Sequence, residues 1–224
     1  MTIHESFADQ SLAEACWQAD QDLAQACLHH PFVQGLGDGT LSRSRFIGYI
    51  AQDAFFLRGF AQAYAAAQAK CQAQGDDAGA QLYADLGQGV ADELRLHRQQ
   101  SADLGIDLDG VQPQPATSAY TSFLQSTAAQ QPEPIIAAAM LPCLRLYAWL
   151  GQSLLPGHHP HGPTAAWVTT YADPAFEALW RRLAPRLQPG ARSPDLRAAI
   201  AAHHRQAMVC ELDFFAGAWA AANS

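Results

Sequence analysis

Helix-forming residues run almost without interruption through this chain, and proline- and glycine-rich clusters separate the runs. Alanine, glutamine and leucine dominate, whereas β-branched residues, which favour strands, are sparse. This pattern predicts an all-α, compact helical bundle of about seven helices, with a ligand pocket between helices. The segments predicted to be helical are residues 12–29, 42–72, 77–104, 118–130, 131–155, 164–171, 174–187 and 194–221.

Serine stands at the predicted start of two of these helices, where its side chain can cap the first turn. Ser42 precedes the second helix, and Ser193 precedes the last. Pro194 suits the first helical position, and Asp195 complements the helix dipole. We therefore expect well-defined helix starts at these two points.

The length and net charge of the chain limit which classes of protein it can belong to. A chain of 224 residues without a long polar linker predicts one domain over residues 1–224. The net charge of −8 argues against nucleic-acid binding, because neutralising phosphates needs a basic surface. The longest apolar run, residues 135–144, is about half of what crosses a bilayer. The first residues form no basic and apolar leader, so we expect a cytoplasmic protein that does not bind membranes.

One short stretch places a thiol and a phenol together. Cys143 and Tyr147 are four residues apart, so on a helix they share one face. A thiol is a soft nucleophile, and a neighbouring phenol can position what it attacks. The alternative is that Cys143 is a small buried hydrophobe. None of the five cysteines forms a Cys-x-x-Cys pair, and in a chain without an export signal all five are expected to be reduced.

Two acidic residues stand among aromatic ones on predicted helices. Asp53 has Phe56 one turn further along, and Glu211 has Phe214 and Phe215. A buried Asp53 would accept hydrogen bonds from a nitrogen heterocycle, and a desolvated Glu211 would have a raised pKa and could move protons. The alternative for each is a carboxylate on a solvated helix face.

Aromatic residues with polar tips complete the candidate set. Tyr120, Tyr147 and Tyr171, together with Phe56, could enclose a flat ring, although such tyrosines more often belong to the core or the rim than to a ligand site.

A metal site is a competing interpretation. Glu93 and His97 share a helix face, and His203 and His204 precede Glu211 by two turns, as in di-iron helical bundles. However, the predicted helix 131–155 offers no acid or histidine after residue 134. No metal and no other cofactor is therefore expected.

Several segments, in order and at matching spacing from about residue 30 to 219, resemble the TenA family (thiaminase II, aminopyrimidine aminohydrolase). The segments are residues 30–41, Arg45-Phe46, Gln52-Asp53, Glu93 before Leu96-His97, residues 119–122, Leu141-Pro142-Cys143 with Tyr147 and Gly151, Thr170-Tyr171, and Glu211.

The resemblance implies a heme-oxygenase-like fold without heme, a homo-oligomer (a tetramer rather than a dimer) and a hydrolase of thiamin salvage. It implies that Cys143 adds to the ring of a 4-amino-2-methylpyrimidine, that Asp53 holds the ring nitrogen and amino group, and that Glu211 moves protons. Tyr147 and Tyr171 match substrate-contacting tyrosines. The small-molecule partner is an aminopyrimidine: the aminomethyl compound, its formylated form or thiamin.

Two positions depart from the family pattern. Phe56 stands where members have a tyrosine that makes the cysteine more nucleophilic, so another group, Tyr120 or Glu211, would activate the thiol. Arg145 lies two residues after Cys143 and is expected to point away from the pocket. A non-catalytic pyrimidine-binding or regulatory protein, and a metal-dependent oxidase on the same fold, remain alternatives.

Overall fold

The computed structural model describes residues 11–104, 111–159, 161 and 164–220. Over these ranges all regular structure is helical, which confirms the predicted all-α class. The elements are α1 (Leu12–Ala19), α2 (Gln21–Leu28), α3 (Pro31–Asp38), α4 (Arg43–Ala73), α5 (Asp77–Leu104), α6 (Pro115–Gln130), α7 (Glu133–Leu154), η1 (Leu155–Gly157), α8 (Ala165–Ala172), α9 (Pro174–Leu183), η2 (Ala184–Arg192) and α10 (Pro194–Ala220).

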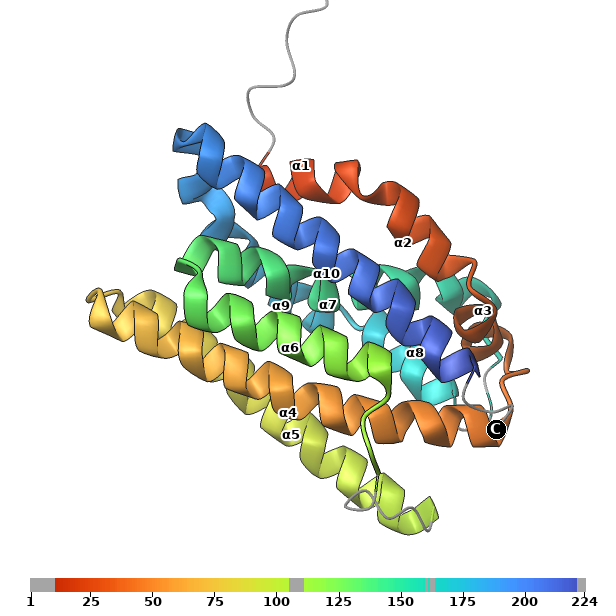
Figure 1. Cartoon of the computed structure of the whole chain (residues 1–224). Coiled ribbons are helices and arrows are strands. Elements are labelled where there is room, and N and C mark those ends of the chain that lie inside the picture. The colour runs from red at the N-terminus through yellow and green to blue at the C-terminus, as the bar shows by residue number, and fades with distance from the viewer. Residues whose placement is uncertain (1–10, 105–110, 160, 162–163, 221–224) are drawn as a thin grey trace, which may run out of the picture.

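Helix α7 lies at the centre of the bundle. It packs against α4, α6, α8, α9 and α10, and every residue from 135 to 142 is buried. The helices α4 and α5 form a long hairpin, and α6 lies along α4 between it and α10 (Figure 1).

The apolar character of α7 raises the question of a membrane span. By length and composition alone, the segment Glu133–Gly157 is long and apolar enough to cross a membrane. The sequence analysis did not predict this, because the longest uninterrupted apolar run is only about half the required length. However, 83% of the tested window is buried inside the fold. This is the pattern of a core helix.

The two predicted serine caps are confirmed. Ser42 Oγ accepts a hydrogen bond from the Arg45 backbone N–H at 3.4 Å, and Ser193 Oγ accepts one from the Leu196 N–H at 3.3 Å. Each side chain satisfies one of the donors that a helix start leaves without an intrahelical acceptor.

The predicted helix count of about seven is too low, because the described residues contain ten α-helices. The single helix predicted over 12–29 is wrong: it breaks at the buried Asp20, whose carboxylate is held by His204 at 2.6 Å and by Arg205 at 2.8 Å. The helix predicted to reach residue 187 ends at Leu183 and the chain continues as the 3-10 helix η2, because Pro185 has no backbone N–H to continue the α-helical hydrogen bonds.

The short helix α3 was not predicted, because Pro31, Gly35 and Gly37 make its propensity low. Tertiary packing explains the glycines. A Cβ on Gly37 would lie 2.7 Å from the Leu154 side chain, so glycine allows α3 to approach the end of α7.

Arg145 points away from the cavity side of α7, as predicted. Its guanidinium lies 4.6 Å from the Trp17 ring and 4.4 Å from the Trp180 ring, and it donates a hydrogen bond to the Glu14 carboxylate at 2.5 Å. Arg145 therefore joins α1 and α9 to the central helix.

Gln52 anchors the start of α6 to α4. Its side-chain oxygen accepts hydrogen bonds from Thr117 Oγ1 at 2.7 Å and the Gln114 N–H at 2.8 Å, and its amide donates to the Gln112 carbonyl at 3.0 Å. Both ends of the Gln52 amide therefore have hydrogen-bond partners, and Gln52 directly precedes Asp53 in the sequence. It therefore fixes the rotation of α4 at that point.

Gly151 brings α8 close to α7, and its substitution should be costly. A Cβ there would lie 2.5 Å from backbone atoms of Tyr171 and Ala172, whereas a Cβ on Gly89 in α5 would meet nothing within 4 Å. We expect Gly151→Ala to lower the free energy of unfolding by about 1–3 kcal/mol, because backbone must move. Gly89→Ala is the control and should raise it by about 0.5–1 kcal/mol. Urea unfolding measures both, and equal stabilities would contradict the close approach.

Candidate active site

A cavity of about 690 Å³ opens between α4, α5, α7, α8 and α9. Its walls are largely aromatic and aliphatic, and its aromatic members are Phe46, Phe56, Phe60, Tyr64, Tyr147, Trp167, Tyr171 and Phe176. Its polar members include the side chains of Asp53, Glu93 and Cys143. An apolar cavity with a few converging polar groups is the usual form of a small-molecule site.

Cys143 lies on the cavity wall of α7, directly after Pro142. Its side chain is half-buried, unlike the four other cysteines, which are fully buried, and all five are free thiols. Burial raises the thiol pKa well above its usual value, and the nearby carboxylates of Glu211, Asp53 and Glu93 raise it further. The thiol of the free protein is therefore protonated and needs a base before it can attack.

Glu211 is the candidate for such a base. It is 1% exposed on α10, and its Oε1 accepts a hydrogen bond from the Tyr120 hydroxyl at 2.8 Å. Burial raises its pKa to about 8, and the charge of Asp53 adds to the rise, while hydrogen bonds from Tyr120 and Tyr147 oppose it. A carboxyl group that titrates near neutral pH can both take and return a proton.

Asp53 lies 5% exposed on the cavity face of α4, where burial raises its pKa to about 7. In its neutral form a carboxyl group offers one O–H donor and one carbonyl acceptor. That pair matches the acceptor and donor of a ring nitrogen beside an amino group. The environment of Asp53 therefore suits an aminopyrimidine edge.

Three of the four predicted aromatic residues, Phe56, Tyr147 and Tyr171, line the cavity. The ring centroids of Phe56 and Tyr120 are 4.8 Å apart, and those of Tyr147 and Tyr171 are 5.0 Å apart. The Tyr171 hydroxyl donates to Glu93 at 3.1 Å. Tyr120 and Glu211 lie behind the wall: Tyr120 backs Phe56, and neither is a lining residue. The structure thus brings all seven predicted residues into one connected cluster.

Four neighbours of this cluster were not predicted as site residues. Trp167 lines the cavity and donates its indole N–H to the Tyr49 hydroxyl at 3.1 Å. Tyr64 and Glu93 also line it. Tyr49 and Tyr64 precede and follow Asp53 by four and eleven residues, so helical spacing could have found them. For Trp167 no sequence signal exists.

The histidines of the competing metal interpretation have other partners. His203 Nδ1 contacts the Ala199 carbonyl at 2.8 Å and its ring stacks on Phe123, while His204 pairs with Asp20. The side chain of His97 is outside the described residues. Among the side chains that the structure describes, no three of His, Cys, Asp and Glu are grouped to hold a metal ion.

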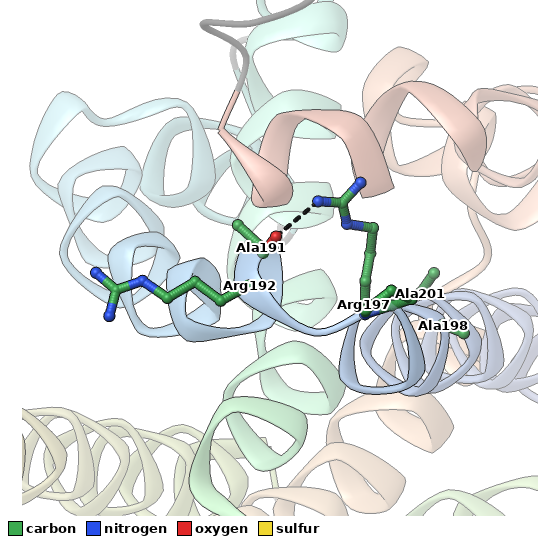
Figure 2. Close-up of a pocket in the computed structure, with 6 residues that line it drawn as sticks. Ala191, Arg192, Arg197, Ala198 and Ala201 are labelled. Atoms are coloured by element: carbon green, nitrogen blue, oxygen red, sulfur yellow. Dashed lines mark hydrogen bonds between the residues drawn. The ribbon is translucent and has the colours of Figure 1, made fainter.

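A second hollow lies at the junction of η2 and α10 (Figure 2). Its lining is Ala191, Arg192, Pro194, Arg197, Ala198 and Ala201. Figure 2 shows Arg192 and Arg197 extending in different directions, with Arg197 donating to the Ala191 carbonyl at 2.8 Å. This lining has no thiol, carboxyl or aromatic group, so the candidate catalytic groups lie at the first cavity.

Burial of the two carboxyl groups has a consequence for stability. The folded pKa values of about 8 for Glu211 and about 7 for Asp53 exceed the ordinary values of 4.5 and 3.8. The folded state therefore binds more protons than the unfolded state between those limits, so stability falls as pH rises through about 4 to 8. A glutamine at position 211 cannot ionise. We therefore expect the melting temperature of Glu211→Gln, minus that of the wild type, to be at least ~3 °C higher at pH 8.5 than at pH 5, given roughly 2–4 °C per kcal/mol. Thermal unfolding at both pH values measures this, and an unchanged difference would contradict a buried ionising Glu211.

The sequence is similar to those of proteins of thiamin metabolism. The chain is 35% identical over 206 residues to the thiamine biosynthesis multifunctional protein ThiED of Corynebacterium efficiens, which covers 90% of this chain but only 27% of that protein. It is 32% identical over 180 residues to the aminopyrimidine aminohydrolase of Halalkalibacterium halodurans, covering 75% of this chain and 77% of that one.

Solved structures agree on the fold. A TenA homologue from Pyrococcus furiosus superposes with a TM-score of 0.85 at 16% identity, covering 92% of this chain and 99% of the other. A Shewanella denitrificans domain with a heme oxygenase-like fold gives 0.75 at 12% identity, with 96% and 95% covered. The expected heme-oxygenase-like fold is confirmed. The family model described as TENA/THI-4/PQQC matches residues 17–216, so the chain belongs to the TENA/THI-4/PQQC family.

Proposed function

We propose that this protein is a thiamin-salvage hydrolase that converts 4-amino-5-aminomethyl-2-methylpyrimidine, or thiamin, to the hydroxymethylpyrimidine. One observation carries the proposal: the half-buried Cys143 thiol opens into an aromatic cavity that also holds Asp53, with Glu211 buried behind its wall. The name of the Halalkalibacterium relative, aminopyrimidine aminohydrolase, supports the same activity.

The reaction uses these groups in sequence. Asp53 pairs with the ring nitrogen and the amino group of the pyrimidine, and the aromatic walls hold the ring. Glu211 accepts the thiol proton, and the Cys143 thiolate adds to the ring. The ring electrons then expel the substituent of the exocyclic methylene: an amine takes the proton from Glu211 as it departs, whereas the thiazolium of thiamin departs as neutral thiazole and takes none. Water adds at the methylene and gives up a proton to the enzyme's carboxyl groups, and the Cys143 thiolate leaves and is reprotonated. In sum, one C–N bond breaks, one C–O bond forms and one water is consumed.

Direct hydrolysis is the test. The wild-type protein is incubated with the aminomethylpyrimidine and, in parallel, with thiamin, and the hydroxymethyl product is followed by chromatography. Product from either substrate supports the hydrolase. Saturable pyrimidine binding without product from either would leave a pyrimidine-binding protein and sink the proposal.

Membership of the family also supports a homo-oligomer, a tetramer rather than a dimer, working in the cytoplasm without a cofactor. Light scattering at micromolar concentration distinguishes the assemblies, and a monomer would contradict this part of the proposal.

A further inference from the structure

Glu93 is a carboxyl group of the cavity that the reaction described above does not use. It lies on α5, and its side chain lines the cavity. The hydroxyl of Tyr171, a residue that is only 7% exposed, donates a hydrogen bond to Glu93 Oε1 at 3.1 Å. This bond holds the carboxyl group against the cavity wall.

Direct contacts connect Glu93 to the nucleophile. The ring of Tyr171 lies edge-on to that of Tyr147, with 5.0 Å between their centroids. Tyr147 is one helical turn beyond Cys143, and both line the cavity from α7. Two tyrosine side chains therefore lead along the wall from Glu93 to the thiol.

The antiparallel pairing of α4 and α5 fixes how far Glu93 lies from Asp53 along the helices. A Cβ on Gly87 would lie 3.9 Å from the Cβ of Tyr64, so these two residues face each other across the hairpin. Six residues further along α5, Glu93 stands at the level of residue 58 of α4, five residues from Asp53. Five residues correspond to an axial rise of about 7.5 Å. A pyrimidine with one exocyclic methylene and a hydrogen bond of about 3 Å at each end is long enough to join the two carboxyl groups.

The charge of the lining indicates what Glu93 faces. No lysine, arginine or histidine is among the lining residues that the structure describes, whereas four carboxyl groups are. Two of these, Asp85 and Asp92, are largely exposed and form ion pairs with arginines. Asp53 serves the ring in the proposed reaction, and Glu93 is the remaining one. A cavity of this kind favours a ligand group that carries positive charge.

We propose that Glu93 binds the departing amine of the substrate and stabilises the positive charge that forms on its nitrogen. This rests on the proposed function, in which Asp53 holds the pyrimidine ring and Cys143 adds to it. The N–H groups of the amine donate to the Glu93 carboxylate, and the nitrogen lone pair receives the proton from Glu211.

The timing of the charge determines which kinetic constant Glu93 controls. The neutral amine becomes positively charged when it takes the proton, and it stays so until the C–N bond breaks and the bonding electrons leave with ammonia. The interaction with Glu93 is therefore stronger at bond cleavage than in the bound substrate. An interaction of this kind raises kcat rather than lowering KM.

The experiment separates the charge of Glu93 from its role in the wall. The wild type and Glu93→Gln are assayed for kcat and KM on the aminomethylpyrimidine, and for the inhibition constant of hydroxymethylpyrimidine. That compound has the same ring but a substituent that takes up no charge. Glutamine keeps an oxygen that can accept from Tyr171 but carries no charge. We expect kcat to fall at least ~10-fold, and the inhibition constant to stay within ~3-fold of wild type.

Glu177→Gln is the matched control. Glu177 is a carboxylate on α9 that is held by Gln152 and Arg181 and does not line the cavity. Its replacement removes the same charge from the protein without touching the cavity wall. We expect it to leave kcat within ~3-fold of wild type.

Each other outcome overturns the assignment of Glu93. Equal losses in kcat and in the binding of hydroxymethylpyrimidine would show that Glu93 only supports the wall. An unchanged kcat, or an equal loss in Glu177→Gln, would show that its carboxylate does not meet the amine. In all these cases turnover by the wild type leaves the proposed function standing. Binding without turnover by the wild type would overturn both.

Discussion

Cys143→Ser should lower kcat/KM for hydrolysis of the aminomethylpyrimidine at least ~100-fold, about 2.7 kcal/mol of barrier. A serine hydroxyl occupies nearly the same space but is a far weaker nucleophile, and the cavity around it offers carboxyl groups that disfavour a second negative charge. Chromatographic rates at saturating and limiting substrate give kcat and KM separately. Because Asp53 and the aromatic walls are untouched, the loss is expected in kcat.

Cys16→Ala provides the matched control. Cys16 is a buried thiol on α1 that does not line the cavity, so its removal should cost stability and leave kcat/KM within a few-fold of wild type. Full activity of Cys143→Ser would assign the nucleophile elsewhere.

Glu211→Gln should lower kcat/KM by about 10²–10⁴-fold, the range that a positioned acid–base group contributes. The amide keeps the shape of the side chain but cannot take the thiol proton. In the proposed reaction Glu211 acts in its ionised form and Asp53 in its neutral form, and their pKa values are raised to about 8 and about 7. The wild-type kcat/KM should therefore rise from acid pH to a maximum between about pH 7 and 8 and fall above it, and the variant should lose the rising limb of the profile.

Tyr120→Phe sharpens this prediction. The Tyr120 hydroxyl lowers the pKa of Glu211 by donating to it, so its removal should move the limb to higher pH. Retention of the rising limb at the same pH in Glu211→Gln would show that another group controls it.

Interactions between residues close in sequence predict most of the helices and part of the candidate site. The serine caps follow from side chains next to their own helix start, and the shared face of Cys143 and Tyr147 follows from helical spacing. The break at Asp20 could not be read from the sequence, because its partners His204 and Arg205 are more than 180 residues away. Helix α3 was missed because the close approach of Leu154 to Gly37 outweighs low propensity.

Some residues of the candidate site can likewise be found from the sequence, and others only from the structure. Asp53 and Glu211 stand out as acids among aromatic neighbours, and the family pattern joins them to Cys143 across three helices. Composition and spacing alone do not place α10 against α7. Trp167 entered the site only through the approach of α8 to α7, which depends on Gly151 and the α8 backbone.

The placement of Trp167 also gives the protein an intrinsic optical reporter. Of the five tryptophans, Trp167 alone lines the cavity, with its ring centroid 4.7 Å from that of Tyr171. Trp17 and Trp180 flank Arg145, Trp149 packs on Trp17, and Trp219 lies against Arg45, all away from the cavity lining. A ligand ring that enters the cavity therefore changes the surroundings, and hence the fluorescence, of Trp167 but not those of the four other tryptophans. Fluorescence titration can then follow occupancy in variants that no longer turn over, without any label.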